Sequence, residues 1–350
     1  MRNSFRIDDV TAEEWTQYGA SFACNNIYQT WSYGEAHSQG LLCSVSRAIL
    51  FQGERPLVMA QFRIARIPLL GIGTATACWG PLWRYDEDVL SAEEHLGEFL
   101  REVKAEYGAK RGLQVRFDPR STFSVDQDTR LVQVFQLHGF GVNAQTRAYR
   151  TIVLDMRLPL NVLHANLDNK WRRELGYSEK EKLQAEVGTS VELFDRFHRL
   201  YNEMWANKTF VTGVDIQSIR RTQCTAMADQ RLLIWIVQHN GEDIGAGVFS
   251  LVGNTVLYLL GASSPQARRK TNPGYFIVWA SIVRAHELGL RWFDLGGITD
   301  VPDSGVDRFK TRMNGTYTMF PGRLEVRRGI VVGTLIDVGI EFLNRLRKLL

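Results

Sequence analysis

The chain has 350 residues, of which 45% are hydrophobic and 23% are charged. These are ordinary values for a globular protein, and they exclude a disordered or fibrous chain. At about 150 residues per domain, this length predicts two domains. The net charge of +4 excludes a histone-like protein but allows local patches that bind phosphate.

The cysteines and the N-terminal segment indicate a cellular compartment. Four cysteines lie far apart and form no Cys-x-x-Cys pair, namely Cys24, Cys43, Cys78 and Cys224. Disulfide frameworks are denser, so we expect reduced thiols. The first residues lack the apolar run of a signal peptide, and no run of 18 apolar residues predicts a membrane span. We therefore expect a cytoplasmic protein.

One series of elements occurs twice along the chain. Each half contains a β-hairpin, a strand followed by glycine, a helix, and a strand that ends in Phe-Asp. In the first half these elements are predicted at 45–65, 74–81, 90–108 and 114–118, and in the second half at 232–252, 255–262, 274–289 and 291–294. The offset falls from 188 residues (Gly53 to Gly241) to 176 residues (Phe117 to Phe293), which fits a diverged duplication. The alternative is that two unrelated α/β domains look alike at this level of detail.

This order predicts an α/β (α+β) fold with two tandem domains, each built on a mixed sheet with a crossover helix. We expect an N-terminal domain over 1–150 and a C-terminal domain over 151–328. A C-terminal amphipathic helix is expected over 329–350. A long polar helical segment over 161–188 and an amphipathic helix over 191–210 follow the boundary.

Motifs of several enzyme classes are missing. The sequence has no Gly-x-Gly-x-x-Gly after a strand, no Walker loop, no His-Glu-x-x-His and no Gly-x-Ser-x-Gly. The seven histidines are scattered and do not have the spacing of metal ligands. We therefore expect no metal site, and a nicotinamide dehydrogenase is disfavoured.

The order of elements resembles the GNAT acetyltransferase fold. That fold binds the pyrophosphate of acetyl-CoA through a Q/R-x-x-G-x-G/A loop, whose glycines let backbone N–H groups approach the phosphates at a helix N-terminus. Counted from Gln266, the two required glycines are replaced by Arg269 and Thr271. We therefore do not expect acetyl-CoA to bind in the usual way.

Several segments occur in the order found in the Fem-type (FemABX) aminoacyltransferases, which add amino acids from aminoacyl-tRNA to peptidoglycan precursors. The chain resembles this family at 28–31, 80–83, 171–183, 201–210, 258–265, 272–298 and 305–315. The most specific part is FDLGGI at 293–298 followed by GVDRFK at 305–310. The resemblance implies two fused GNAT-like domains. The long coiled-coil arm of some members is not expected here, because no heptad run of that length occurs.

The resemblance implies an enzyme that joins the amino acid of an aminoacyl-tRNA to an amine acceptor, such as a peptidoglycan precursor or another peptide or small molecule, without a bound cofactor. Segment 32–40 lacks the lysine with which many members bind the diphosphate of a nucleotide-linked precursor. The acceptor is therefore expected to differ from the usual one. Two alternatives stay open. One is a CoA-dependent GNAT-type N-acyltransferase of cell-envelope polysaccharide synthesis, with acyl-CoA as donor, and the other is a non-catalytic binding module.

The resemblance also implies site residues. Lys310 matches a family lysine and is expected to stabilise the oxyanion as a catalytic cation. Phe309 is expected to stack on the terminal adenosine of the tRNA, and Arg308 to contact a phosphate. The alternative is that Arg308, Lys310 and Arg312 form the solvated polar face of a strand, with Phe309 and Met313 as packing residues.

Further residues complete the predicted site. Asp294 is expected either to orient the acceptor amine or to cap the glycine turn that follows it. Substrate contacts are predicted at Gln29, Trp31, Tyr258 and Tyr275, with core packing as the alternative for Tyr258. A tRNA-binding or phosphate-binding surface is predicted at Arg172, Arg173, Arg268, Arg269 and Lys270, with a merely solvated surface as the alternative.

The C-terminal segment carries an apolar stripe at helical spacing, followed by cations. The stripe consists of Val331, Leu335, Val338, Phe342, Leu346 and Leu349, and the cations are Arg345, Arg347 and Lys348. This pattern predicts peripheral contact with the inner face of a membrane, or a helix docked on its own domain.

Overall fold

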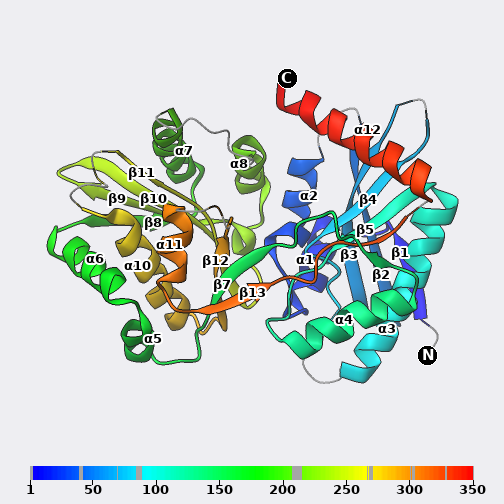
Figure 1. Ribbon diagram of the computed structural model, residues 1–350, viewed down its shortest axis with the longest axis horizontal. Coiled ribbons are helices and arrows are strands. Elements are labelled where there is room, and N and C mark those ends of the chain that lie inside the picture. The colour runs from blue at the N-terminus through cyan, green and yellow to red at the C-terminus, as the bar shows by residue number, and fades with distance from the viewer. Residues whose placement is uncertain are drawn as a thin grey trace. The chain divides into compact units, whose positions relative to one another are not determined.

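The computed structural model describes residues 3–38, 42–68, 70–83, 89–206, 215–265, 267, 271–299, 301, 304–327 and 329–349. The chain divides into two compact units (Figure 1). The first unit comprises residues 1–148 and 319–350, and the second comprises residues 149–318. Each unit is built on a seven-stranded mixed sheet.

The sheet of the first unit has the order β1-β2-β3-β4-β5-β14-β6. Its strands are β1 (Asn3–Ile7), β2 (Cys43–Gln52), β3 (Arg55–Arg66), β4 (Gly73–Cys78), β5 (Leu113–Asp118), β6 (Gly141–Val142) and β14 (Leu324–Val326). The hairpin expected over 45–65 is confirmed as β2 and β3, which pair antiparallel around a turn at Gly53. Gly53 has a φ of 62°, a value that glycine adopts without strain.

Helices cover both faces of this first sheet. They are α1 (Ala12–Ala20), η1 (Ile27–Gln29), α2 (Trp31–His37), α3 (Val89–Val103), η2 (Lys104–Lys110), α4 (Val125–Leu137) and α12 (Ile330–Leu349). On one face, α3 and α4 bury Phe99 and Phe135 in a core with Phe62 and Phe117 of the sheet. A second core places Trp15 of α1 with residues of β2 and β3.

The sheet of the second unit has the order β13-β7-β12-β11-β10-β9-β8. Its strands are β7 (Arg150–Asp155), β8 (Gln184–Gly188), β9 (Leu233–His239), β10 (Glu242–Ser250), β11 (Thr255–Ser263), β12 (Trp292–Gly297) and β13 (Thr316–Met319). The expected hairpin over 232–252 is confirmed as β9 and β10. The two tandem mixed-sheet units confirm the predicted fold class.

The helices of the second unit are α5 (Leu160–Asn166), α6 (Asn169–Lys180), α7 (Val191–Ala206), α8 (Ile216–Thr225), η3 (Ala228–Gln230), α10 (Pro273–Glu287) and α11 (Gly305–Thr311). Helix α10 packs on β10 and against α6, whereas α7 crosses β9, β10 and β11 and contacts α8. The single helical segment expected over 161–188 was wrong. Asp168 caps a new helix, and residues 184–188 leave the helical path to pair with β9 as β8.

The structure corrects one predicted boundary. Residues 319–328 were expected in the second domain, but they belong to the first unit. The reason is strand pairing, because β14 lies between β5 and β6 and is antiparallel to both. Just before β14, the guanidinium of Arg323 donates to both carboxylate oxygens of Asp118 at 2.8 and 2.9 Å. The chain therefore returns to its first sheet before it ends.

A buried charge network anchors β14. Glu325 is 4% exposed. Its carboxylate lies 3.2 Å from the Arg116 guanidinium, accepts from Gln114 at 3.1 Å, and accepts from Asn143 at 2.9 Å. Removing one member of a buried ion pair leaves the other charge uncompensated, which is far more costly than losing an exposed pair.

We therefore expect Glu325→Ala to lower the free energy of unfolding by about 3 kcal/mol. Glu54→Ala, at the exposed tip of the β2–β3 hairpin, is the matched control and should change it by less than about 0.5 kcal/mol. Urea unfolding followed by tryptophan fluorescence measures both. Equal effects of the two substitutions would show that the network does not anchor β14.

Candidate active site

The two central parallel strands separate in the second unit but not in the first. In the first unit, β4 and β5 stay paired from Gly73↔Leu113 to Cys78↔Asp118. In the second unit, β11 and β12 pair only from Thr255↔Trp292 to Leu257↔Asp294, although both strands continue through described residues. β11 and β12 therefore part after three residue pairs, whereas β4 and β5 stay paired over six.

Irregularities in both strands accompany this separation. The pairing of β10 with β11 shifts register at Val248/Phe249, and the pairing of β12 with β7 shifts between Asp294 and Gly297. Such bulges redirect a strand and are common beside active sites. Gly296, within the second shift, has a φ of 76°. A Cβ at Gly296 would also collide with the carbonyl oxygen of Tyr258. Only glycine fits this position.

Asp294 holds this bulge in place. Its side chain is fully buried, accepts from the Gly296 backbone N–H at 2.9 Å, and accepts from the Thr151 hydroxyl at 2.5 Å. This geometry is the turn-capping alternative that the sequence allowed for Asp294. With no exposed surface, Asp294 acts on the site through the backbone that it fixes.

Lys310 lies at the end of β12 where the strands have separated. It belongs to α11, whose first turn is capped by the Ser304 hydroxyl. The ammonium of Lys310 donates to the carbonyl oxygen of Gly297 at 2.8 Å, and the residue is only 8% exposed. The polar strand that the sequence offered as an alternative for 308–312 was wrong, because residues 305–311 form a helix.

Burial lowers the pKa of Lys310 to about 8, and the nearby carboxylates of Asp294 and Asp307 partly oppose this shift. Asp307 is itself held by the backbone N–H of Thr299 at 3.1 Å and by the Thr299 hydroxyl at 2.8 Å. Lys310 therefore stays mostly protonated at pH 7 but titrates close to the physiological range, where an unperturbed lysine does not. Such shifts are typical of functional sites.

An aromatic cluster flanks Lys310. The ring of Phe309 lies 4.9 Å from that of Tyr275 on α10 and 5.7 Å from that of Trp171 on α6. Phe309 and Tyr275 are half-buried, whereas Trp171 has no exposed surface. Tyr258, also half-buried, stacks on Phe249 at 4.9 Å, and burial raises the pKa of its phenol to about 12.

A carboxylate occupies the N-terminal end of α10. Glu174 of α6 accepts a hydrogen bond from the side chain of Asn272 at 2.7 Å. Asn272 is the N-cap of α10, and the next residue, Pro273, has no N–H to offer. In the GNAT fold this helix end is where the pyrophosphate would bind. The negative charge of Glu174 disfavours a diphosphate there.

Two predicted substrate residues lie in the first unit, where they have structural roles. Gln29 is 1% exposed, donates to the Cys78 carbonyl at 2.8 Å, and accepts from the Gln61 backbone N–H at 2.8 Å. The ring of Trp31 covers the Arg47 guanidinium, with 3.4 Å between the guanidinium carbon and the ring centroid. Both residues join α2 and η1 to the sheet.

The predicted basic surface is only partly described. Arg172 donates to the Ala165 carbonyl and to Asn169 at the start of its own helix. Arg173 has 57% of its side chain exposed, and Arg308 is also exposed. Arg268, Arg269 and Lys270 lie outside the described residues.

Sequence reasoning missed three residues that shape this site, namely Thr151, Glu174 and Asp307. Thr151 gave no signal, because its contact with Asp294 joins positions 143 residues apart. Glu174 stood within a run of alternating charges, which usually indicates a solvated helix surface.

Among the described residues, no group of three His, Cys, Asp or Glu side chains could hold a metal ion.

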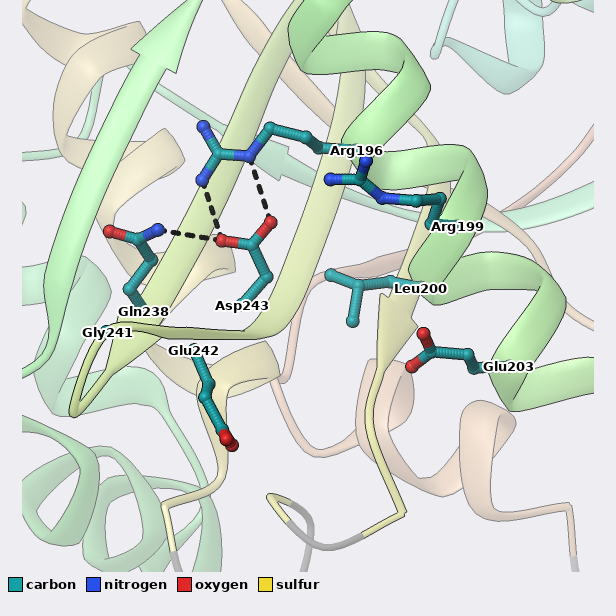
Figure 2. A pocket seen from close by; sticks show the side chains of 8 residues that line it. All are labelled: Arg196, Arg199, Leu200, Glu203, Gln238, Gly241, Glu242 and Asp243. Carbon is teal, nitrogen blue, oxygen red and sulfur yellow. Dashed lines mark hydrogen bonds and ion pairs between the residues drawn. The ribbon is translucent and has the colours of Figure 1, made fainter.

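A cavity of about 460 Å³ lies elsewhere on the second unit, between α7 and the β9–β10 turn (Figure 2). There the guanidinium of Arg196 donates to both oxygens of Asp243 at 2.9 and 2.7 Å, and this contact holds the pKa of Asp243 below its usual value. Neither Lys310 nor its neighbours line this cavity. We interpret the ion pair as a structural connection between α7 and the hairpin.

The pKa of Lys310 generates a test of stability against pH. Between pH 8 and 10.5 the unfolded chain binds the lysine proton more tightly than the folded protein does, so this group adds stability as the pH rises. Below pH 8 both states are protonated, and burial of the ammonium costs about 3 kcal/mol. Lys310→Met should therefore raise the free energy of unfolding at pH 7 by about 1–3 kcal/mol, and the gain should shrink toward pH 10.

Urea unfolding of both proteins at several pH values measures this difference. Lys180→Met, at an exposed position of α6, is the control and should show no pH-dependent gain. A gain at Lys310 that stays constant from pH 7 to pH 10 would contradict the lowered pKa.

Comparisons with known proteins address the fold. Residues 165–311 match the model of the acetyltransferase (GNAT) domain. No curated protein matches the sequence. The structure is similar to that of FemX, with a TM-score of 0.79 and 16% identity over 95% of this chain and 99% of that one.

Two other solved structures are similar over nearly the whole chain. One is a C-terminal domain assigned to a lysylphosphatidylglycerol synthetase of Agrobacterium fabrum, with a TM-score of 0.58 and 13% identity, covering 96% of this chain and 97% of that one. The other is a tandem GNAT protein from the clavulanic acid biosynthesis pathway, with a TM-score of 0.50 and 12% identity, covering 94% of this chain and 99% of that one.

The match of residues 165–311 to the GNAT acetyltransferase domain supports acyl transfer as the general type of activity, whereas the similar solved structures show the fold. The expected resemblance to the Fem-type aminoacyltransferases is confirmed at the level of the fold. Residues 165–311 match a GNAT acetyltransferase domain, and the chain as a whole has the tandem GNAT-like fold of FemX.

Proposed function

We propose that the protein is a Fem-type aminoacyltransferase, which forms an amide bond between the amino acid of an aminoacyl-tRNA and an amine acceptor such as a peptidoglycan precursor or another peptide. The observation that carries the proposal is the buried ammonium of Lys310 at the point where β11 and β12 separate. In the first unit, β4 and β5 remain paired at the equivalent place.

The proposed reaction replaces the ester bond of the aminoacyl-tRNA with an amide bond. The acceptor amine attacks the ester carbonyl carbon, a C–N bond forms, and the C–O bond to the tRNA ribose breaks. The proton lost by the amine ends on the ribose oxygen. The ester is already reactive, so orientation of the two substrates and stabilisation of the oxyanion are enough.

Lys310 fits the stabilising role. An ammonium has three N–H donors, and one of them is used on the Gly297 carbonyl oxygen, which fixes the position of the group. Two donors remain for the oxyanion or for the departing ribose oxygen. Asp294 is a positioning residue here, because it fixes the Gly296 turn and its charge favours the protonated form of Lys310.

The neighbours of Lys310 suit the end of a tRNA. The half-buried ring of Phe309 offers a surface on which the terminal adenosine can stack. Arg308 is exposed on the same helix, and its planar guanidinium matches the geometry of a phosphate. Tyr275 lies against Phe309 and extends this aromatic surface.

A CoA-dependent N-acyltransferase is the second candidate, because residues 165–311 match the GNAT acetyltransferase domain. Two features disfavour it. The loop before α10 lacks the required glycines, and the Glu174 carboxylate lies at the helix end that would bind the pyrophosphate. A non-catalytic module is disfavoured by Lys310 itself, since a buried ammonium costs stability that a mere scaffold has no reason to retain.

Substitutions of Lys310 test the proposed chemistry. Lys310→Ala and Lys310→Met should each lower turnover by roughly 10²–10³-fold, the usual effect of removing one donor to an oxyanion. Lys310→Arg should not restore the rate, because the guanidinium is larger and planar. The assay is product mass after incubation with charged tRNA and amine acceptors, with Lys180→Met as the control.

The pH dependence of turnover distinguishes a protonated Lys310 that stabilises the oxyanion from a neutral Lys310 that acts as a general base. The ratio of wild-type to Lys310→Met turnover cancels the titration of the acceptor amine. The ratio should be flat below pH 8 and fall about tenfold per pH unit above it, because the ammonium is lost. A ratio that rises toward pH 8 would make Lys310 a general base, and turnover of Lys310→Ala within threefold of wild type would overturn its role.

The donor is tested by binding. Acetyl-CoA should bind with a Kd weaker than about 1 mM, whereas the affinity for tRNA should fall steeply with salt as counterions are released. Glu174→Gln keeps the hydrogen bond to Asn272 and removes the charge, so it should tighten any residual CoA binding. Micromolar affinity of the wild type for acetyl-CoA in calorimetry would favour the CoA-dependent candidate.

A further inference from the structure

Helix α12 is docked on the first unit in a fixed rotation. Asp337 forms ion pairs with Arg116 of β5 and, at 3.2 Å, with Arg327. Ile336 has no exposed surface, and Gly333 is buried beside it. The helix also contacts β4 of the same sheet (Figure 1). These contacts determine which side of α12 faces inward.

The opposite side of α12 is apolar. Four large side chains at helical spacing are exposed, namely Val332 (37%), Leu335 (55%), Val338 (62%) and Phe342 (60%). A surface helix normally turns its apolar stripe toward the core. Here Ile336, Gly333 and the ion-paired Asp337 face the sheet, whereas four larger apolar side chains face outward. A continuous exposed stripe of this kind marks an interaction surface. We call these four residues the α12 stripe.

Charge indicates what covers the α12 stripe. The last six residues of the chain contain three cations, Arg345, Arg347 and Lys348, and no acid. Two copies joined in parallel through their stripes would bring these six cations together. An anionic lipid surface would instead complement the positive charge of this end of the chain. Within the described residues, no helix is long and apolar enough to cross a membrane.

We propose that α12 binds an anionic lipid bilayer, with Val332, Leu335, Val338 and Phe342 entering the interface and the positive charge of the C-terminal sequence favouring anionic headgroups. Amphipathic helices with cations beside an apolar stripe bind bilayers in this way. The first unit would then be held at a membrane surface by its last element. This surface lies in the first unit, so it does not depend on the assignment of Lys310.

Sedimentation of the full chain with large vesicles tests the proposal. The protein should bind vesicles of phosphatidylcholine mixed with phosphatidylglycerol, bind pure phosphatidylcholine poorly, and be released by high salt. The double variant Leu335→Ser/Phe342→Ser should bind at least about tenfold more weakly. The matched control is Leu137→Ser at the end of α4, where the side chain is 82% exposed, and it should bind like the wild type.

Several outcomes would overturn the proposal. They are no sedimentation of the wild type, equal binding to both kinds of vesicle, and equal weakening by Leu137→Ser. Sedimentation equilibrium without lipid tests whether a second copy of the chain covers the α12 stripe instead. A wild-type dimer that becomes a monomer in the double variant would assign the stripe to that second copy. Transfer to a water-soluble acceptor should be the same in wild type and double variant. If neither protein catalyses transfer while the wild type still binds vesicles, the result counts against the proposed function and not against this surface.

Discussion

The hydrogen bonds of the Asp294 carboxylate to the Gly296 backbone and to Thr151 are the interactions on which the candidate site depends. They hold a turn that only glycine can adopt there. Because of this turn, β12 leaves β11 after three residue pairs, and the Gly297 carbonyl oxygen becomes the acceptor that positions Lys310. One buried side chain thus accounts for both the end of the β11–β12 pairing and the position of the Lys310 ammonium.

The buried Lys310 ammonium lowers the stability of the fold while serving the proposed function. A buried ammonium destabilises the folded protein, and burial lowers its pKa to about 8. Asp294 and Asp307 reduce this cost by keeping negative charge close to Lys310. Neither carboxylate has to touch a substrate for this purpose. A residue that costs stability and is supported by two others is typical of a functional site rather than of a scaffold.

The two units illustrate how one series of elements can serve different ends. In the first unit, β4 and β5 remain paired to Cys78 and Asp118, and polar residues such as Gln29 complete the packing beside them. That unit also receives β14 and α12, so the end of the chain stabilises the sheet with which the chain began. Its separate contribution is the α12 stripe.

Local pattern in the sequence was enough to determine the two hairpins and the repeated order of elements, because turn residues and hydrophobic periodicity act over a few positions. The resemblance to the GNAT and Fem-type families added the tandem GNAT-like fold and singled out Lys310 and Phe309, which are neighbours in the chain. Tertiary structure alone decided three things. These are the return of residues 319–328 to the first unit, the contact of Thr151 with Asp294, and the carboxylate of Glu174 at the start of α10. Each depends on residues far apart in the sequence. Strand pairing and side-chain hydrogen bonds at such separations leave no periodic trace, whereas burial of apolar stripes does.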